Sequence, residues 1–244
     1  MRLQFVGCGD AFGTGGRFNT CFHLVGERTN LLIDCGASSL VALERLGIAR
    51  AAIDLILITH FHADHIGGVP FFILDAQFSG RTRPLTIAGP PGIETWYERV
   101  METAFEHSSK VTRKFETRLV TLSERQTVPI AGADVTAFPV VHGKSGGPFY
   151  ALRVAAEGKV VTYSGDTEWT DTLVEASAGA DLFVTECYVH DRPAKNHMSY
   201  AALAANKARL DARRIVLTHM SRDMLAHAGD VPETCAEDGL VVEV

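Results

Sequence analysis

"THFHADHIGG", residues 59–68, crowds three histidines and an aspartate into one short stretch of the chain. These residues follow a nearly continuous apolar run, "IDLILITH" (53–60), which predicts a strand buried on both faces. Neutral imidazole and carboxylate groups are suitable ligands for zinc, manganese or iron. Burying them without a metal would leave several polar groups unsatisfied. The stretch therefore predicts a metal-binding loop, with His60, His62, Asp64 and His65 as its candidate ligands.

Three further apolar runs also end in a metal-binding residue type. The runs "AFPVVH", "VVTYSGD" and "RIVLTH" end in His142, Asp166 and His219. A lone histidine at a strand end is more often structural than a ligand. Together, however, these strand ends indicate a β-rich scaffold that brings ligands from distant parts of the sequence to one edge.

The number of candidate ligands favours two metal ions. His60 and His62 can hold one ion, whereas Asp64 and His65 suit a second ion nearby. His142 and His219 can complete one site each, and the two oxygens of Asp166 can bridge the ions. Two ions about 3.5–4 Å apart can share a hydroxide that attacks an acyl or phosphoryl group. We expect two divalent ions, zinc first, with manganese and iron as alternatives.

The remaining pattern predicts a mixed α/β protein of the α+β kind. Short apolar runs bounded by Gly or Asp predict many strands, including a hairpin around Glu157 and Gly158. Helical spacing and stop signals predict helices over 37–47, 68–78, 93–105, 169–178 and 199–210. No composition break or long linker divides the chain, so we expect a single domain over residues 1–244.

Composition and charge exclude several classes of protein. The net charge is −6, which provides no global attraction to nucleic acid or to an acidic membrane. No apolar run reaches the roughly 18 residues of a membrane span, and no secretory leader is visible. The five cysteines are scattered and odd in number, which is typical of reduced thiols. We therefore expect a cytoplasmic protein without membrane contact.

The combined motifs resemble those of the metallo-β-lactamase fold. "THFHADH" (59–65) matches its HxHxDH signature. Asp34 in "LLIDCG" resembles the structural aspartate near the metal loop, and "VVHG", "SGDT" and "LTHM" resemble the later ligand motifs. The resemblance covers essentially the whole chain. It implies a four-layer αββα sandwich, with two mixed sheets face to face, helices outside and the metals at one edge.

Within that fold the chain most resembles the ribonuclease Z-like phosphodiesterases. The likeness is carried by "GPPG" (89–92), "SGDT" (164–167), "NHMSYAAL" (196–203) and "LTHMS" (217–221). It implies that His197 acts near the scissile phosphate, with Ser199 as a helix cap. It also implies that Asp64 accepts a proton from the attacking water, besides binding metal. The other histidines, His23, His107, His190 and His227, are expected on the surface or behind the ligands.

One departure concerns the substrate. Enzymes that process the tRNA 3′ end carry a long arm between the third and fourth ligand motifs, but here only a loop and a hairpin separate His142 from Asp166. We therefore expect a small or exposed phosphodiester, such as a cyclic or short linear nucleotide, with short RNA as an alternative. The basic segment 110–118 would be a solvated surface, or would contact phosphate in a homodimer. Residues 143–147 are expected to form a loop beside the metals.

Three other functions stay open. The same metals could serve a lactone, thioester or β-lactam hydrolase, although such an enzyme has no need of His197 as a cation. A tRNA 3′-processing endoribonuclease is the second alternative. The third is a metal-binding accessory protein without hydrolytic turnover.

Overall fold

The computed structural model describes residues 1–144 and 147–244, in which two seven-stranded sheets pack face to face. The first sheet has the order β14 (Val241–Glu243), β1 (Arg2–Gly7), β2 (Cys21–Val25), β3 (Asn30–Ile33), β4 (Leu55–Leu57), β5 (Leu85–Gly89) and β6 (Thr117–Thr121). The second has the order β13 (Thr234–Cys235), β12 (Ile215–Thr218), β11 (Leu182–Glu186), β10 (Lys159–Tyr163), β9 (Tyr150–Ala156), β8 (Ala133–Pro139) and β7 (Thr127–Ile130). Each sheet contains both parallel and antiparallel pairs.

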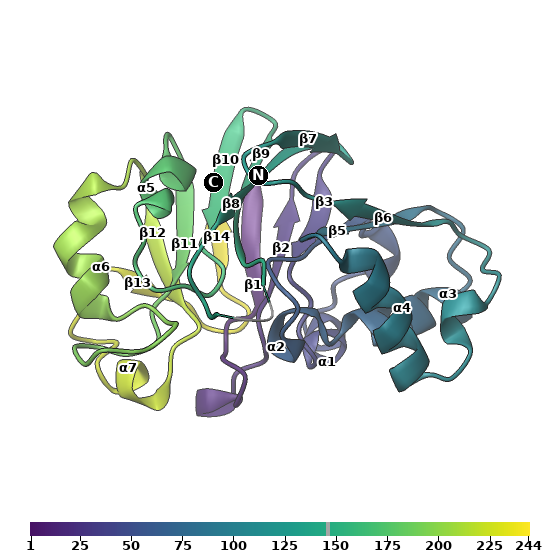
Figure 1. The fold of residues 1–244 in the computed structure, drawn as a ribbon, viewed down its shortest axis with the longest axis horizontal. Helices are drawn as coiled ribbons and strands as arrows, with labels where there is room; N and C mark the ends of the chain where they lie inside the picture. Colours follow the sequence, from purple (N-terminus) through teal and green to yellow (C-terminus); the bar gives the residue numbers. More distant parts are fainter. Residues whose placement is uncertain (145–146) are drawn as a thin grey trace.

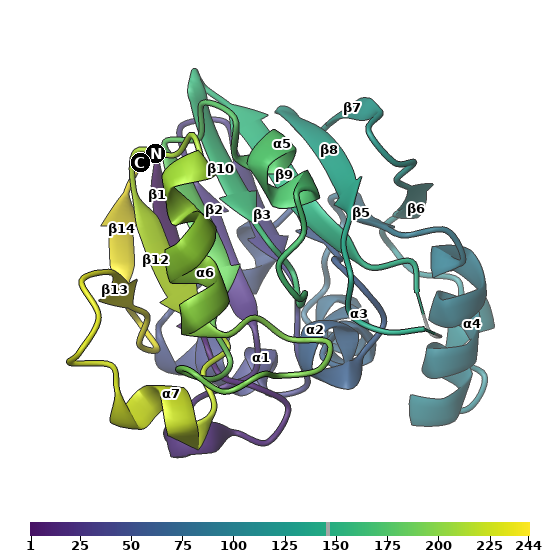
Figure 2. The same cartoon turned by 60° about the vertical axis from the view of Figure 1, so that its left-hand side comes forward.

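Helices cover the outer face of each sheet (Figure 1). Beside the first sheet lie α1 (Ser39–Arg45), α2 (Ala63–Ile66), α3 (Val69–Phe78) and α4 (Ile93–Ala104). Beside the second lie α5 (Thr172–Ser177), α6 (Tyr200–Asn206) and α7 (Arg222–Ala226), as the turned view in Figure 2 also shows. Short 3₁₀ helices are η1 (Thr14–Gly16), η2 (Arg50–Ala52), η3 (Ser108–Lys110) and η4 (Lys207–Arg209). This arrangement confirms the αββα sandwich and the metallo-β-lactamase fold.

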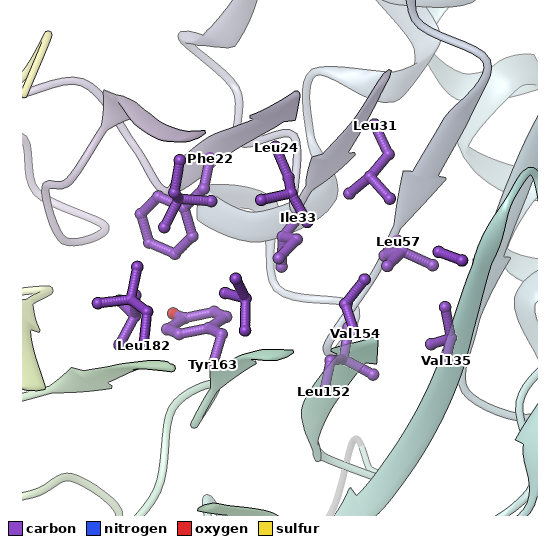
Figure 3. Close-up of a cluster of buried hydrophobic side chains, with 14 of the residues drawn as sticks. Phe22, Leu24, Leu31, Ile33, Leu57, Val135, Leu152, Val154, Tyr163 and Leu182 are labelled. Atoms are coloured by element: carbon purple, nitrogen blue, oxygen red, sulfur yellow. The ribbon is translucent and has the colours of Figure 1, made fainter. Parts of the chain in front are cut away.

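The buried side chains form a layer between the sheets and a further layer under each set of helices. Figure 3 shows Phe22, Leu57, Leu152 and Tyr163 of the two sheets meeting in the central layer. Strand β4 is buried on both faces, as predicted, because successive side chains of a strand point to opposite sides. Its residues Leu55 and Leu57 join the central layer, whereas Ile56 packs with α1, α3 and α4.

The predicted elements are present, but several end earlier than expected. Strands β4, β8 and β10 each end three residues before their ligand candidates His60, His142 and Asp166. These three ligand candidates therefore lie on loops that follow strands, not on the strand tips themselves. The predicted helix 199–210 is α-helical only to Asn206 and continues as η4, while α2, α7 and β13 were not predicted.

Two further predictions concern a hairpin and a loop. The hairpin at Glu157 and Gly158 is confirmed, with both residues at positive φ between β9 and β10. Of the predicted loop 143–147, residues 145–146 lie outside the described residues. Within the described part of the chain, no helix combines the length and the apolar character that crossing a bilayer requires.

Candidate metal centre

The metal loop is a short connection that close backbone packing holds in place. His62 has an extended backbone and precedes the single turn of α2, which carries Asp64 and His65. The backbone amide of Cys35 donates to the His65 carbonyl at 2.6 Å, and that of Ala37 donates to the Ala63 carbonyl at 3.1 Å. A Cβ at Gly36 would lie 2.2 Å from the Asp64 carbonyl oxygen, so only glycine permits this approach.

One cluster consists of His60, His62 and His142. The distance from His62 Nδ1 to His60 Nε2 is 3.1 Å, and that from His62 Nδ1 to His142 Nε2 is also 3.1 Å. All three donor atoms lie within 4.8 Å of one another. A tetrahedral zinc ion with bonds of about 2.0–2.1 Å sets its ligand atoms about 3.3 Å apart, which fits this spacing.

A second cluster consists of Asp64, His65, Asp166 and His219. The distance from His65 Nε2 to Asp166 Oδ1 is 3.3 Å, and that from His219 Nε2 to Asp166 Oδ2 is 3.3 Å. The same Oδ2 atom lies 3.6 Å from His142 Nε2 of the first cluster. Asp166 therefore stands between the two clusters, with an oxygen toward each.

The ring nitrogens that face away from the clusters have partners of their own. Nδ1 of His60 lies 3.0 Å from Thr59 Oγ1, and Nδ1 of His219 lies 3.3 Å from Thr20 Oγ1. Nδ1 of His142 donates to the Asn196 carbonyl at 2.7 Å. Such outer contacts fix the tautomer and ring orientation of metal-binding histidines, which leaves Nε2 of each ring for a ligand.

The local electrostatics suit a cation. Burial lowers the pKa of His142 and His219, and lowers that of His60 well below its ordinary value, so these rings are neutral and can offer a lone pair. Burial also opposes the charged forms of His65 and Asp166. The attraction of Asp166 and Asp34 nevertheless raises the pKa of His65 well above its ordinary value, and the attraction of His219 and His65 lowers that of Asp166 well below its own.

Unsatisfied polar atoms support the fit to a metal. Among the described residues, His65 Nε2 and Asp166 Oδ1 are buried and have no hydrogen-bond partner. Buried polar groups are almost always paired, so such orphans require an explanation. A divalent cation between them would satisfy both atoms and would use ligand types that zinc, manganese and iron accept.

A histidine–carboxylate pair adjoins the clusters. Nδ1 of His197 donates to Oε2 of the fully buried Glu186 at 2.9 Å, and the backbone amide of Thr167 donates to Oε1. Burial opposes the charged imidazole, but the hydrogen bond that His197 donates to Glu186 outweighs it and raises the pKa of His197 to about 9. The ring of His197 lies 4.8 Å from that of His142 and stacks on Tyr188 at 4.5 Å between ring centroids. His197 is therefore a cation beside the candidate metal ligands.

An open cavity of about 240 Å³ gives access to this centre. Its lining includes His62, Asp64, His142, Asp166, Asn196, His197 and His219, together with Asp10, Ala11, Phe12 and Tyr188. Two larger surface hollows lie around Glu157 and the β9–β10 turn, and neither is lined by a residue of the His/Asp clusters. The chemistry therefore points to the smaller cavity.

Sequence reasoning missed Glu186, although a signal existed. Strand β11, "LFVTE", runs into an acidic residue in the way that the four chosen strands run into their ligands. Ser199 caps α6 as predicted, because its side chain accepts from the Ala202 amide at 3.2 Å. The histidines outside the motifs lie away from the cavity, but His23 is buried against Asn30, whereas a position on the surface or behind the ligands was expected.

Comparisons with known proteins agree with the fold. Ribonuclease Z of Agathobacter rectalis is 29% identical over 89% of this chain and 86% of its own length. The crystal structure of human tRNase Z, short form, superimposes with a TM-score of 0.80 at 24% identity, covering 100% of this chain and 99% of that one. The metallo-β-lactamase fold protein YhfI from Bacillus subtilis gives 0.79 at 21% identity, with 99% of both chains covered.

Fold, site and relatives together define a metal-dependent hydrolase of the metallo-β-lactamase fold that is similar to ribonuclease Z. A family model described as "Anti-Pycsar protein Apyc1" matches residues 1–236, which is nearly the whole chain. The chain belongs to that family.

Proposed function

We propose that this protein is a phosphodiesterase that uses two divalent metal ions, zinc first, with manganese and iron as alternatives. His60, His62 and His142 hold one ion, and Asp64, His65 and His219 hold the other. Asp166 contributes an oxygen to each. The proposal is supported by the position of Asp166, whose Oδ2 lies 3.3 Å from His219 Nε2 and 3.6 Å from His142 Nε2. A single tetrahedral zinc would use only about four of these seven side chains.

The observation that carries the phosphodiester assignment is the pairing of His197, which lines the cavity, with the buried Glu186 at 2.9 Å. Two bound ions would lower the pKa of water and neutralise phosphate oxygens. His197, protonated and oriented by Glu186, then donates to the leaving oxygen and attracts the charge that develops on phosphate. A carboxyl ester carries no such anion in its ground state, so a lactone or thioester hydrolase would have less use for this cation.

Asp64 is the second proposed catalytic residue. Burial favours its neutral form, but the charge of His65, whose Nε2 lies 3.3 Å from Asp64 Oδ2, outweighs this and lowers the pKa of the Asp64 carboxyl. Asp64 therefore stays ionised near neutral pH, and its carboxylate lines the cavity. An ionised carboxylate in this position can accept a proton from the attacking water as well as bind metal.

The substrate that suits this cavity is a small or exposed phosphodiester, such as a cyclic or short linear nucleotide, with short RNA as an alternative. A volume of about 240 Å³ falls below the roughly 300–1,000 Å³ of ordinary ligand pockets. Between His142 and Asp166 the chain forms the β9–β10 hairpin, which leaves no length for a tRNA-gripping arm. The basic segment 110–118 does not line the cavity, and its Arg118 pairs with Glu116 at 2.6 Å.

We also propose a domain organisation, a cellular location and an oligomeric state. A single domain over 1–244 is proposed because the seven candidate ligands come from segments that follow strands of both sheets. A cytoplasmic location is proposed because the described structure holds Cys8, Cys21, Cys35, Cys187 and Cys235 as free thiols. A homodimer is proposed because segment 110–118 of one copy could then contact a substrate bound by the other copy.

A substrate panel tests the proposed function. The metal-stripped protein is reconstituted with zinc, manganese or iron and assayed on bis(p-nitrophenyl) phosphate, cyclic nucleotides, short RNA, precursor tRNA, a lactone and a thioester. We expect metal-dependent hydrolysis of the small diesters, with higher kcat/KM than for precursor tRNA. Specific 3′ cleavage of precursor tRNA above all small diesters would instead identify a tRNA-processing enzyme. Turnover of lactone or thioester alone would move the protein to that hydrolase class, and no turnover of any compound would favour an accessory protein.

A further inference from the structure

An exposed phenylalanine stands at the entrance to the candidate metal centre. Phe12 lies in the loop between β1 and β2, and 81% of its surface is accessible. It lines the same 240 Å³ cavity as the metal ligand candidates and His197. Single exposed apolar residues are common and need no explanation. The position of this one, beside the reacting groups, suggests contact with the substrate.

Hydrogen bonds hold the backbone of the loop that carries Phe12. The almost fully buried carboxylate of Asp10 accepts hydrogen bonds from the Phe12 amide at 3.1 Å and from the Thr14 amide at 3.0 Å. Its second oxygen accepts from Thr14 Oγ1 at 2.7 Å. The Asn19 side chain donates to the Asp10 carbonyl at 3.0 Å. The backbone of Phe12 is therefore held in place, and its ring is presented at the cavity without being packed into the core.

The far end of this loop rests on another element. A Cβ at Gly15 of η1 would lie 2.9 Å from Leu225 Cδ1 of α7, so the two segments are in contact. Figure 1 shows η1 projecting beyond the first sheet toward α7, and Figure 2 shows the two side by side. A loop supported at both ends can hold an aromatic ring against a ligand with little loss of conformational entropy on binding.

A second aromatic ring lines the cavity. Tyr188 stacks on His197, with ring centroids 4.5 Å apart and an angle of 27° between the planes. The cavity thus combines metal-binding groups, which suit a phosphate, with aromatic surface, which suits a flat apolar group. A nucleotide carries both kinds of group, linked through its sugar.

We propose that Phe12 is a specificity-determining residue that stacks on the nucleobase of the phosphodiester substrate. This inference rests on the proposed function and deepens it by naming a base-binding subsite. Stacking on an aromatic ring tolerates all bases, because every base offers a π face. The subsite therefore favours base-bearing diesters over alkyl or base-free diesters and discriminates little among the bases.

Kinetics with matched variants test the subsite. The variants are Phe12→Ala, Phe12→Leu and Phe12→Tyr, with Phe78→Ala as control because Phe78, at the end of α3, is 80% exposed and does not line the cavity. For a nucleoside cyclic phosphate, Phe12→Ala should raise KM about 5- to 150-fold, while Phe12→Tyr retains the wild-type value. Phe12→Leu should resemble Phe12→Ala. For the base-free ribose cyclic phosphate, all variants should match wild type.

Calorimetry provides a readout that does not depend on turnover. Metal-loaded wild type should bind AMP more tightly than ribose 5-phosphate, and Phe12→Ala should remove most of that difference. If wild type hydrolyses no phosphodiester but shows this pattern, the proposed function fails and the base subsite stands. If wild type hydrolyses nucleotides and Phe12→Ala stays within about twofold on every substrate, the subsite is wrong. Equal losses on base-bearing and base-free compounds would indicate a structural role, and a lower sedimenting mass of Phe12→Ala would indicate a contact between copies; either result overturns the proposal.

Discussion

Asp34 and His65 form a fully buried carboxylate–imidazole pair, in which His65 Nδ1 donates to Asp34 Oδ2 at 2.7 Å. The same carboxylate accepts from the Thr59 amide and from Thr59 Oγ1, each at 2.8 Å. Asp34 thus links the start of the metal loop to its end. The pair orients His65 so that its Nε2 faces Asp166.

Asp34→Asn should weaken metal binding about 10- to 100-fold, as loss of such outer partners does at other metal sites. Asparagine tolerates the positive φ of 58° at this position, so the variant tests the carboxylate and not the backbone. Chelator competition measures the dissociation constants. Asp75→Asn on α3, where Asp75 pairs with Arg50 away from the cavity, is the control. Equal metal affinity in both variants would contradict the orienting role of Asp34.

Asp166→Ala should weaken both metal sites together, because its carboxylate lies within 3.6 Å of a histidine of each cluster. Elemental analysis after dialysis should find well under one ion per chain, whereas the wild type retains two. Asp64→Ala provides the comparison. Because Asp64 belongs to the second cluster only, this variant should lose mainly one ion. A single tightly held ion in fully loaded wild type, or normal activity of Asp166→Ala, would rule out a shared carboxylate.

His197→Ala should fold and keep its metals, yet lose about 10²- to 10⁴-fold in phosphodiesterase kcat, the usual contribution of a positioned acid. Its ring lies 4.8 Å from that of His142, but His197 belongs to neither the three-residue nor the four-residue cluster. His190→Ala, at a histidine that stacks on His227 outside the cavity, should leave the rate unchanged. Rates within about threefold of wild type, or metal content that falls in step with activity, would remove His197 from catalysis.

Glu157→Gln should lower the free energy of unfolding at pH 7 and should have a smaller effect on it at acidic pH. The Glu157 carboxylate accepts hydrogen bonds from the backbone amides of Arg28, Glu27 and Thr29, which lower its pKa from the ordinary 4.5 to about 2. A depressed carboxyl pKa stabilises the fold fully above about pH 4.5, and this stabilisation is lost as the pH falls toward 2.

Urea unfolding at several pH values checks this expectation. The difference between wild type and Glu157→Gln should be largest near pH 7 and should shrink between pH 4.5 and 2. Glu98→Gln, at an exposed position of α4, serves as the control and should differ little from wild type at any pH. A Glu157→Gln effect that is independent of pH would mean that the backbone contacts do not depend on the charge.

The local pattern of the sequence determined the strands, most helices and the candidate ligands. Apolar runs of strand length, such as "IDLILITH", are readable because burial on both faces requires uninterrupted apolar side chains. Glu157 and Gly158 marked their hairpin because few residue pairs accept two successive positive φ values. His60, Asp64 and His65 were conspicuous because buried imidazoles and carboxylates need a compensating partner, whereas His62, which was expected to be buried with them, is exposed.

Only the tertiary structure decided how these groups are brought together and which others join them. The sequence led us to expect His142 with His60 and His219 with His65, but their proximity depends on the packing of two sheets, which no local pattern encodes. The role of Glu186 also depends on the fold. The structure places this residue, at the end of β11, beside His197, and a buried carboxylate acts through the cation next to it. The sequence likewise does not distinguish Phe12 from other loop residues, because neither its exposure nor its position at the cavity can be inferred from its neighbours in sequence. Contacts between residues far apart in the chain are set by packing, and packing is a property of the whole fold.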